Sequence, residues 1–319
     1  MDILLLGGNR FGFTHAESYR RLGYDFSVFS RNEEVLKRYR DEFNVKRTYS
    51  DLNEAMNSSD NIIDMVMPHY MHRDLAVRAM NQGKNVLIEK PVAVSLEEAR
   101  EMINISKKNN VKFMVAEQYH FDSSLLHAIE YVKEGKIGKV HTIIVRSQWN
   151  MKEDGWRTNE KLMGGGALID GGIHFVEALL NLGGDYEEIE SRVYKGNSSI
   201  EGEDNSISMI KFKSGATGLL YYSWNYESPP NVPEYEVIGT GGSIYENRVN
   251  DDHNPEHPRT AFGMPVLNGK VQDIKEVDVF DAEISGFLSA VERNEDVPYS
   301  PELAYRNLKA VLEIYRNSK

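Results

Sequence analysis

The sequence contains no cysteine among its 319 residues. Without thiols the chain cannot form a disulfide framework, a thiolate metal site or a cysteine nucleophile, and we expect no metal centre. No apolar run approaches the roughly 20 residues that a membrane-spanning helix needs. The apolar stretch from Ile3 to Leu6 is also too short for the core of a signal peptide. We therefore expect a soluble, cytoplasmic protein with no membrane partner.

Acidic residues outnumber basic residues in the chain. The 37 lysines and arginines are outnumbered by 49 acidic residues, which gives a formal net charge of -12. Such a chain repels phosphate backbones as a whole, so we expect no nucleic-acid partner, although a local basic pocket could still hold one nucleotide. The length is enough for two domains.

A short apolar run, Asn85 to Ile88, ends abruptly in Glu89, Lys90 and Pro91. A continuous apolar run of this length is typical of a buried parallel strand. Ligands of open α/β sheets bind outside the carboxyl ends of the strands, so Lys90 is predicted to face a bound substrate. A solvated strand end is the alternative interpretation.

The start of the chain predicts a phosphate-binding turn. An apolar strand, Asp2 to Leu6, leads into a glycine-rich turn and then a helical pattern up to Leu22. In this arrangement a pyrophosphate rests on backbone N–H groups at the positive end of the helix. The spacing matches G-x-G-x-x-G except at the second glycine, where asparagine tolerates left-handed dihedrals better than most residues. The turn residues expected to bind the cofactor are Gly7, Asn9, Arg10, Phe11 and Gly12.

Ser30 and Arg31 follow the second predicted strand, Asp25 to Phe29. An acid at this point would bind the ribose 2′-hydroxyl of NAD, whereas Arg31 and Ser30 could hold the 2′-phosphate of NADP. We therefore expect NADP as the preferred cofactor, with NAD as a possible second. Alternatively, Arg31 merely precedes a helix opened by Asn32.

The hydrophobic pattern divides the chain near residue 120. Six strands alternate with helices over the first 120 residues, which predicts a doubly wound parallel (Rossmann) sheet in a dinucleotide-binding domain, 1–120. Period-two alternation then predicts an antiparallel sheet in a second domain, 121–319. Its expected strands are 140–149, 189–195, 205–213, 216–225 and 233–239, its last helices lie near 279–293 and 301–317, and 247–262 is a polar loop.

A second candidate site lies in the glycine-rich segment from Gly164 to His174. From Ala167 onward the spacing is helical, so Asp170 and His174, four residues apart, are predicted to share one helix face. A carboxylate one turn before an imidazole can orient it and raise its basicity, which suits acid–base chemistry. The alternative is a partly buried histidine with a purely structural role.

Four motifs together resemble the Gfo/Idh/MocA family of nicotinamide-dependent oxidoreductases over essentially the whole chain. They are Gly7 to Gly12, Pro68 with His72, Glu89-Lys90-Pro91, and Gly164 to His174. The resemblance implies a Rossmann domain followed by an α+β domain whose large open, mainly antiparallel sheet often mediates oligomers. It further implies catalytic roles for Lys90, Asp170 and His174, and cofactor contacts at Pro68, His72 and Glu89.

The resemblance also implies a substrate class, namely a hydroxyl-bearing or keto carbon of a sugar, cyclitol or related polyol. Trp156 and Arg157 resemble a substrate-proximal element, and Tyr119 lies at an expected substrate edge that lacks the arginine often found there. An uncovered apolar sheet face is an association surface, so we expect a homodimer or homotetramer. Two alternatives stay open: a cofactor-binding sensor without turnover, and a redox-neutral glycosidase that retains its nicotinamide.

Overall fold

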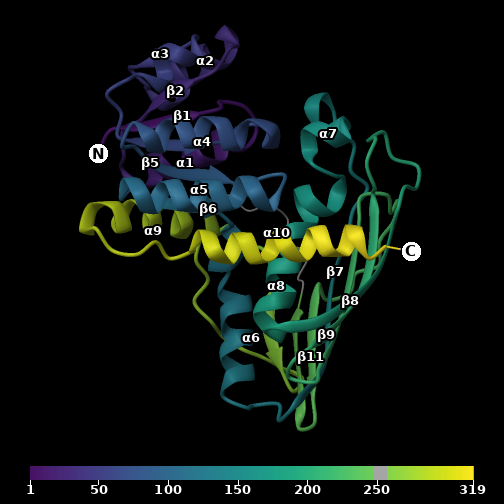
Figure 1. Cartoon of the computed structure of the whole chain (residues 1–319). Helices are drawn as coiled ribbons and strands as arrows, with labels where there is room; N and C mark the ends of the chain where they lie inside the picture. Colours follow the sequence, from purple (N-terminus) through teal and green to yellow (C-terminus); the bar gives the residue numbers. More distant parts are fainter. Residues whose placement is uncertain (248–256, 319) are drawn as a thin grey trace. The chain divides into compact units, whose positions relative to one another are not determined.

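The computed structural model describes residues 1–247 and 257–318. It forms two compact units. Figure 1 draws the whole chain with colours that follow the sequence. Unit 1 comprises residues 1–117 and 280–305, and unit 2 comprises 118–279 and 306–319. Residues 280–305, which the sequence pattern assigned to the second domain, thus pack with the first 117. Of the predicted polar loop 247–262, residues 248–256 lie outside the described residues.

Unit 1 is built on a six-stranded parallel sheet with the order β3-β2-β1-β4-β5-β6. The doubly wound Rossmann sheet is therefore confirmed. The apolar residues of β1, β4, β5 and β6 are buried because helices cover both faces. The strands are β1 (Ile3–Leu6), β2 (Ser27–Phe29), β3 (Thr48–Tyr49), β4 (Ile62–Met65), β5 (Asn85–Glu89) and β6 (Phe113–Ala116).

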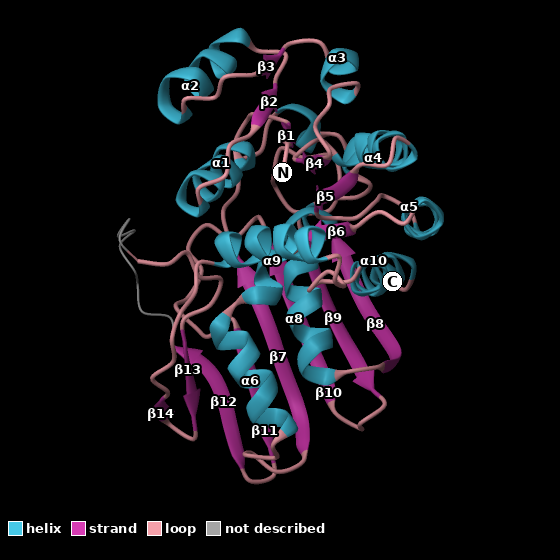
Figure 2. Cartoon of the chain, turned by 90° about the vertical axis from the view of Figure 1, so that its left-hand side faces the viewer, coloured by secondary structure: helices cyan, strands magenta, loops and turns pink. Residues whose placement is uncertain are grey.

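Figure 2 shows α1 and α2 on one side of this sheet and α4 and α5 on the other. Side chains mark several helix starts as the sequence suggests: Asn32, Asp51 and Ser95 each accept a hydrogen bond from the backbone two or three residues on. The helices are α1 (Phe11–Leu22), α2 (Glu33–Phe43), α3 (Leu52–Met56), α4 (His72–Asn81), α5 (Leu96–Asn109) and α9 (Val279–Arg293).

Unit 2 is built on an eight-stranded sheet with the order β14-β13-β12-β11-β7-β10-β9-β8. Every pair is antiparallel except β7 with β10, so the mainly antiparallel sheet is confirmed. The strands are β7 (Val140–Gln148), β8 (Tyr186–Tyr194), β9 (Asn205–Phe212), β10 (Thr217–Ser223), β11 (Tyr235–Gly239), β12 (Gly242–Asn247), β13 (Met264–Leu267) and β14 (Lys270–Val271). The pattern missed the last three, which lie together at one edge of the sheet.

Helices α6 and α8 cross one face of this second sheet (Figure 2). Burial alternates along β9 and β10 because one face of each strand lies under the helices. The helices of unit 2 are α6 (Ser123–Lys133), α7 (Glu160–Met163) and α8 (Ile173–Gly183), and α10 (Pro301–Arg316) begins in unit 1 and ends in unit 2. The predicted ends of most elements agree within about two residues, the usual uncertainty of helix and strand boundaries.

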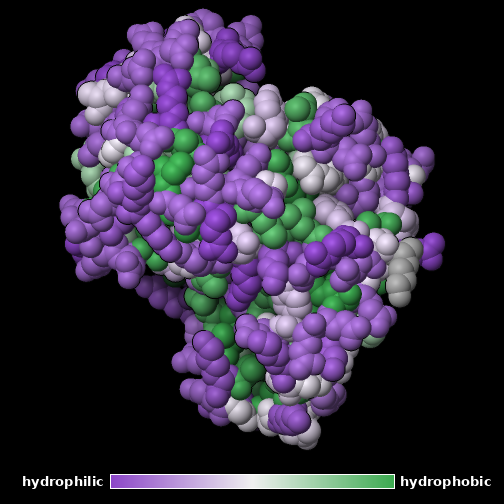
Figure 3. Space-filling model, in the orientation of Figure 1, coloured by the Kyte–Doolittle hydropathy of each residue, from purple (hydrophilic) through white to green (hydrophobic). Residues whose placement is uncertain are grey.

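Hydrophilic residues predominate on the face of the molecule drawn in Figure 3, with hydrophobic residues in patches between them. Over the described ranges 1–247 and 257–318, no helix is long and apolar enough to cross a membrane.

Candidate functional site

The turn between β1 and α1 has the backbone of a phosphate-binding loop. Gly7 and Arg10 take positive φ angles of 117° and 42°, and the Gly12 amide donates to the carbonyl of Asn9 over 2.8 Å. A Cβ at Gly12 would lie 2.2 Å from the Gly7 oxygen, so only glycine fits there. Asn9 itself has no positive φ angle, and the residue after it, Arg10, has one.

The helix end that follows this turn suits an anion. Arg10, the N-cap residue of α1, makes no side-chain capping hydrogen bond among the described residues, and the first turn, which starts at Phe11, contains no acidic residue. The first N–H groups of a helix need such partners, and the helix dipole favours a negative one. The turn also follows β1, whose neighbours β2 and β4 lead the chain in opposite directions across the sheet, the usual position of a dinucleotide site. The donor set therefore fits the pyrophosphate of a dinucleotide.

Ser30 and Arg31 lie between β2 and α2. The Ser30 hydroxyl accepts a hydrogen bond from the Asn32 amide over 3.2 Å, and the Asn32 side chain accepts from Glu34 over 2.9 Å at the start of α2. Ser30 is buried and Arg31 is exposed. Ser30 thus shapes the loop, while the Arg31 guanidinium lies on the surface of unit 1.

Glu89 ends β5, and Lys90 follows it immediately, as predicted. Both side chains are buried, and the Lys90 amide donates to the Glu89 carboxylate over 3.2 Å. The peptide bond between Lys90 and Pro91 is cis. Lys90 lies at the carboxyl end of β5, which pairs with β4 on one side and with the edge strand β6 on the other.

His72 links this strand end to the loop after β4, which begins near Pro68. Its Nδ1 lies 2.9 Å from the Pro91 carbonyl oxygen and its Nε2 lies 2.8 Å from that of Met67. Burial, together with the nearby His69, lowers the pKa of His72 to about 4. The ring is thus neutral near pH 7, and one of its two nitrogens donates.

Asp170, in unit 2, lies in a five-residue π-helix, Leu168–Gly172, and not in a regular α-helix. His174 follows in α8, so the simple α-helical spacing predicted for the pair is wrong. The Asp170 carboxylate accepts from Arg157 Nε over 2.8 Å, and the Arg157 guanidinium lies 4.5 Å from the ring centre of Trp156. The structure therefore brings together three of the predicted site residues, Trp156, Arg157 and Asp170. The pairing of Asp170 with His174 stays a prediction.

His174 stacks on Tyr119. The ring centres are 4.4 Å apart and the planes differ by 15°. Tyr119 also meets Phe175 and Phe262 edge-on, at 5.5 and 5.4 Å. Aromatic contacts of this kind fix ring orientation, so the imidazole of His174 is held in one plane.

A clamp that the sequence did not reveal holds the segment before Asp170. The Tyr315 hydroxyl accepts from the Ile169 amide over 3.1 Å and donates to Glu203 over 2.9 Å, and Glu203 accepts from the Leu168 amide over 2.8 Å. Burial raises the pKa of Glu203 to about 7. Glu203 and Tyr315 are 112 positions apart in the chain, and no local sequence pattern predicts their contact.

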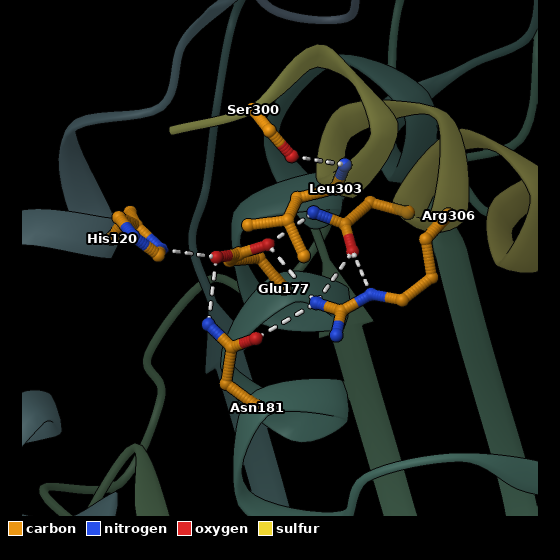
Figure 4. Close-up of polar contacts among 7 residues, drawn as sticks. His120, Glu177, Asn181, Ser300, Leu303 and Arg306 are labelled. Atoms are coloured by element: carbon orange, nitrogen blue, oxygen red, sulfur yellow. Dashed lines mark hydrogen bonds and ion pairs between the residues drawn. The ribbon is translucent and has the colours of Figure 1, made fainter. Parts of the chain in front are cut away.

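A second missed cluster surrounds Glu177, one turn after His174 on α8. Figure 4 shows its carboxylate among His120, Asn181 and Arg306. His120 Nδ1 lies 2.9 Å away and Asn181 donates over 2.7 Å. Although burial acts to raise it, the bond from His120 and the Arg306 charge hold the pKa of Glu177 below its usual value. Because His120 follows Tyr119 directly, this cluster attaches the Tyr119 segment to α8.

Across the residues that the structure describes, no three His, Asp or Glu side chains are arranged to hold a metal ion. The candidate chemical groups of the two units are the turn before α1, Lys90 at the end of β5 and His174 stacked on Tyr119.

Comparison with known families agrees with this architecture. Residues 1–117 match the oxidoreductase family with an NAD-binding Rossmann fold, and residues 125–245 match the GFO/IDH/MocA C-terminal domain. The chain belongs to the Gfo/Idh/MocA family. It is therefore a member of an oxidoreductase family with an NAD-binding Rossmann fold.

Several relatives of this Gfo/Idh/MocA member are named enzymes. The levoglucosan dehydrogenase of Pseudarthrobacter phenanthrenivorans is 24% identical over 290 residues, which cover 78% of this chain and 74% of that protein. The NADP(+) scyllo-inositol 2-dehydrogenase of Bacillus subtilis is 26% identical over 279 residues, covering 84% and 81%. The solved levoglucosan dehydrogenase in complex with NADH and levoglucosan superposes with a TM-score of 0.84 at 21% identity, covering 100% and 97%. This last likeness shows the shared fold.

Proposed function

We propose that the chain transfers a hydride between NADP(H) and a hydroxyl-bearing or keto carbon of a sugar, cyclitol or related polyol. The observation that carries this proposal is the buried His174, held in one plane by Tyr119, on the helix that follows Asp170. An imidazole titrates nearest neutral pH and is a common general acid or base. The sugar and inositol enzymes among the relatives support the substrate class.

In this proposal three side chains act on the reacting hydroxyl. The bound nicotinamide supplies or accepts the hydride. His174 gives or takes the hydroxyl proton. Lys90 bonds the same oxygen, and its positive charge stabilises the negative charge that develops there. Asp170, which Arg157 holds, orients the substrate.

The remaining roles follow the two domains. We propose that residues 1–120 bind the dinucleotide and that residues 121–319 bind the substrate and form the oligomer. The proposed substrate contacts are Tyr119, Trp156 and Arg157, and the proposed cofactor contacts are Gly7, Asn9, Arg10, Phe11, Gly12, Ser30, Arg31, Pro68, His72 and Glu89. The uncapped start of α1 supports the cofactor assignment.

The test is single-turnover hydride transfer with a substrate found by screening polyols and keto sugars with NADP. Lys90→Met and His174→Ala should each lower the rate by roughly 10²–10⁴, the usual range for acid–base catalysis, with NADP affinity nearly intact. The exposed Lys270 and His141 provide matched controls as Lys270→Met and His141→Ala. If the two site variants keep parental rates, Lys90 and His174 are structural and the proposed mechanism is wrong. If the parent itself transfers no hydride with any substrate of the screen, a sensor function is the better explanation.

We also propose a preference for NADP, because Arg31 is exposed beside the predicted 2′-phosphate position and no acid replaces it. The B. subtilis relative is named for NADP(+), while the solved levoglucosan dehydrogenase is in complex with NADH. Calorimetry with both cofactors tests this preference.

The open face of the second sheet supports a homodimer or homotetramer. Ile207, Met209 and Leu219 are 48%, 45% and 41% exposed, and Met209 pairs directly with Leu219 across β9 and β10. Neighbouring exposed apolar side chains of this kind mark association surfaces. Light scattering at micromolar concentration tests the assembly.

A further inference from the structure

A buried histidine in unit 1, His15, has no part in the function proposed so far. His15 lies on α1, Asp64 on β4, Glu89 at the end of β5 and Glu283 on α9, and all four side chains are buried. We call these four residues the His15 cluster.

Both nitrogens of the His15 ring face carboxylate oxygens. Nδ1 lies 2.8 Å from Asp64 Oδ2, and Nε2 lies 3.4 Å from Glu89 Oε1. A neutral imidazole has one N–H, so its other nitrogen would turn a lone pair toward a carboxylate. The contact with Glu89 is an ion pair and not a hydrogen bond, and only the imidazolium carries a positive charge that attracts both carboxylates. The Tyr19 hydroxyl also donates to Asp64 Oδ2 over 2.8 Å, which fixes that carboxylate as an acceptor.

The charge balance leads to the same protonation state. Three ionised carboxylates beside a neutral imidazole would place three negative charges in the protein interior, which costs far more than retaining protons. Although burial opposes it, the charges of Asp64 and Glu89 and the hydrogen bond to Asp64 raise the pKa of His15 well above its usual value. Burial raises the pKa of Glu283 well above its usual value, so Glu283 is the neutral acid. The titratable groups that face the ring are Tyr19 from α1, Asp64 from β4, Glu89 from β5 and Glu283 from α9, with Glu117 facing Glu283.

Glu89 connects this buried cation to the proposed catalytic strand end. One of its carboxylate oxygens faces His15, and the other accepts the backbone N–H of Lys90 over 3.2 Å. The chain of contacts runs from Asp64 through His15 and Glu89 to the main chain of Lys90. Displacement of a catalytic group by about 1 Å can cost roughly a hundredfold in rate.

We propose that His15 is a permanently protonated positioning residue, which holds Glu89 and through it the backbone of Lys90. The positioning role of His15 rests on the proposed catalytic function of Lys90. The positive charge of His15 is independent of that function.

The charge is tested by NMR titration of imidazole nitrogens in the whole chain, with the His15 signal assigned by its loss in His15→Gln. We expect that signal to stay in the imidazolium form at neutral pH. Titration of His15 below pH 7 would overturn the proposal. Glu283→Gln should melt at or above the parental temperature, and a large fall would show that Glu283 is ionised.

Positioning is tested by kinetics well below the melting temperature. His15→Gln should lower kcat by roughly tenfold to a hundredfold, with the substrate KM within about twofold, because the geometry of Lys90 changes and not the binding surface. His141→Gln is the matched control and should keep the parental kcat. An unchanged kcat in His15→Gln, even with a lowered melting temperature, would show a merely structural role. If Lys90→Met also keeps the parental rate, the proposed function fails, while the NMR result still decides the charge of His15.

Discussion

Replacing Glu203 by glutamine should make the stability of the protein less dependent on pH. The Glu203 carboxylate accepts hydrogen bonds from the Leu168 amide and the Tyr315 hydroxyl, and the amide oxygen of glutamine can accept the same two. Glutamine cannot ionise, however. Any difference between the parent and Glu203→Gln that varies with pH therefore reports the ionisation of this one group.

The magnitude follows from the pKa. Burial raises the pKa of Glu203 from 4.5 to about 7. Because the folded chain holds this proton more tightly than the unfolded chain, the stabilisation is complete below pH 4.5 and is lost as the pH rises through 7. A shift of this size corresponds to on the order of 3 kcal/mol in the free energy of unfolding. The two proteins should match near pH 4.5, and the variant should be the more stable at pH 8 by up to that amount.

Urea denaturation from pH 4.5 to 9, followed by tryptophan fluorescence, measures this difference. Exposed Glu190 supplies the control, since Glu190→Gln should follow the parental curve at every pH. If Glu203→Gln also follows the parental pH dependence, Glu203 is ionised throughout, and the account of its burial is refuted.

Four further outcomes can be checked with single variants. Arg31→Ala should weaken NADP binding by about 1.5–3 kcal/mol, the usual value of a bond to a charged group, and leave NAD binding unchanged; an equal loss for both cofactors in calorimetry would contradict the assignment. Leu219→Lys should dissociate the oligomer in light scattering, because it places a charge on the exposed apolar face; a parent that is already monomeric would contradict the proposed assembly. Gly183→Ala would place a Cβ 2.2 Å from the Phe212 ring, and denaturation should show a loss of about 1–3 kcal/mol from overpacking. Glu177→Gln breaks a buried ion pair, so the free energy of unfolding should fall by about 3 kcal/mol or more.

Local pattern was enough to predict the framework of both units. The run before Lys90 is continuous and apolar because β5 is buried on both faces, and the alternation in β9 and β10 reflects one covered face. The same patterns correctly placed Lys90 at a strand end. Such patterns predict structure wherever buried side chains recur with the period of a helix or a strand.

Contacts between distant segments have no such signal. No residue near Glu203 in the sequence predicts its contact with Tyr315. The apolar spacing of 279–293 predicts the helix α9 but does not indicate which sheet it covers. The π-helix that contains Asp170 is a further example, because a Cβ at Gly171 would lie 2.0 Å from the Tyr222 hydroxyl of β10. That close approach is a property of packing and not of helical spacing.

The return of residues 280–305 to unit 1 has a consequence for synthesis on the ribosome. The first 117 residues emerge early, but the helix that brings Phe280 and Glu283 to His15 is made more than 160 residues later. Until then the nascent Rossmann sheet lacks part of its cover, and its buried histidine and acids lack the groups that close around them. We expect the first unit to reach full protection from hydrogen exchange only after the second has been translated, so that stalled chains ending near residue 270 should expose α1.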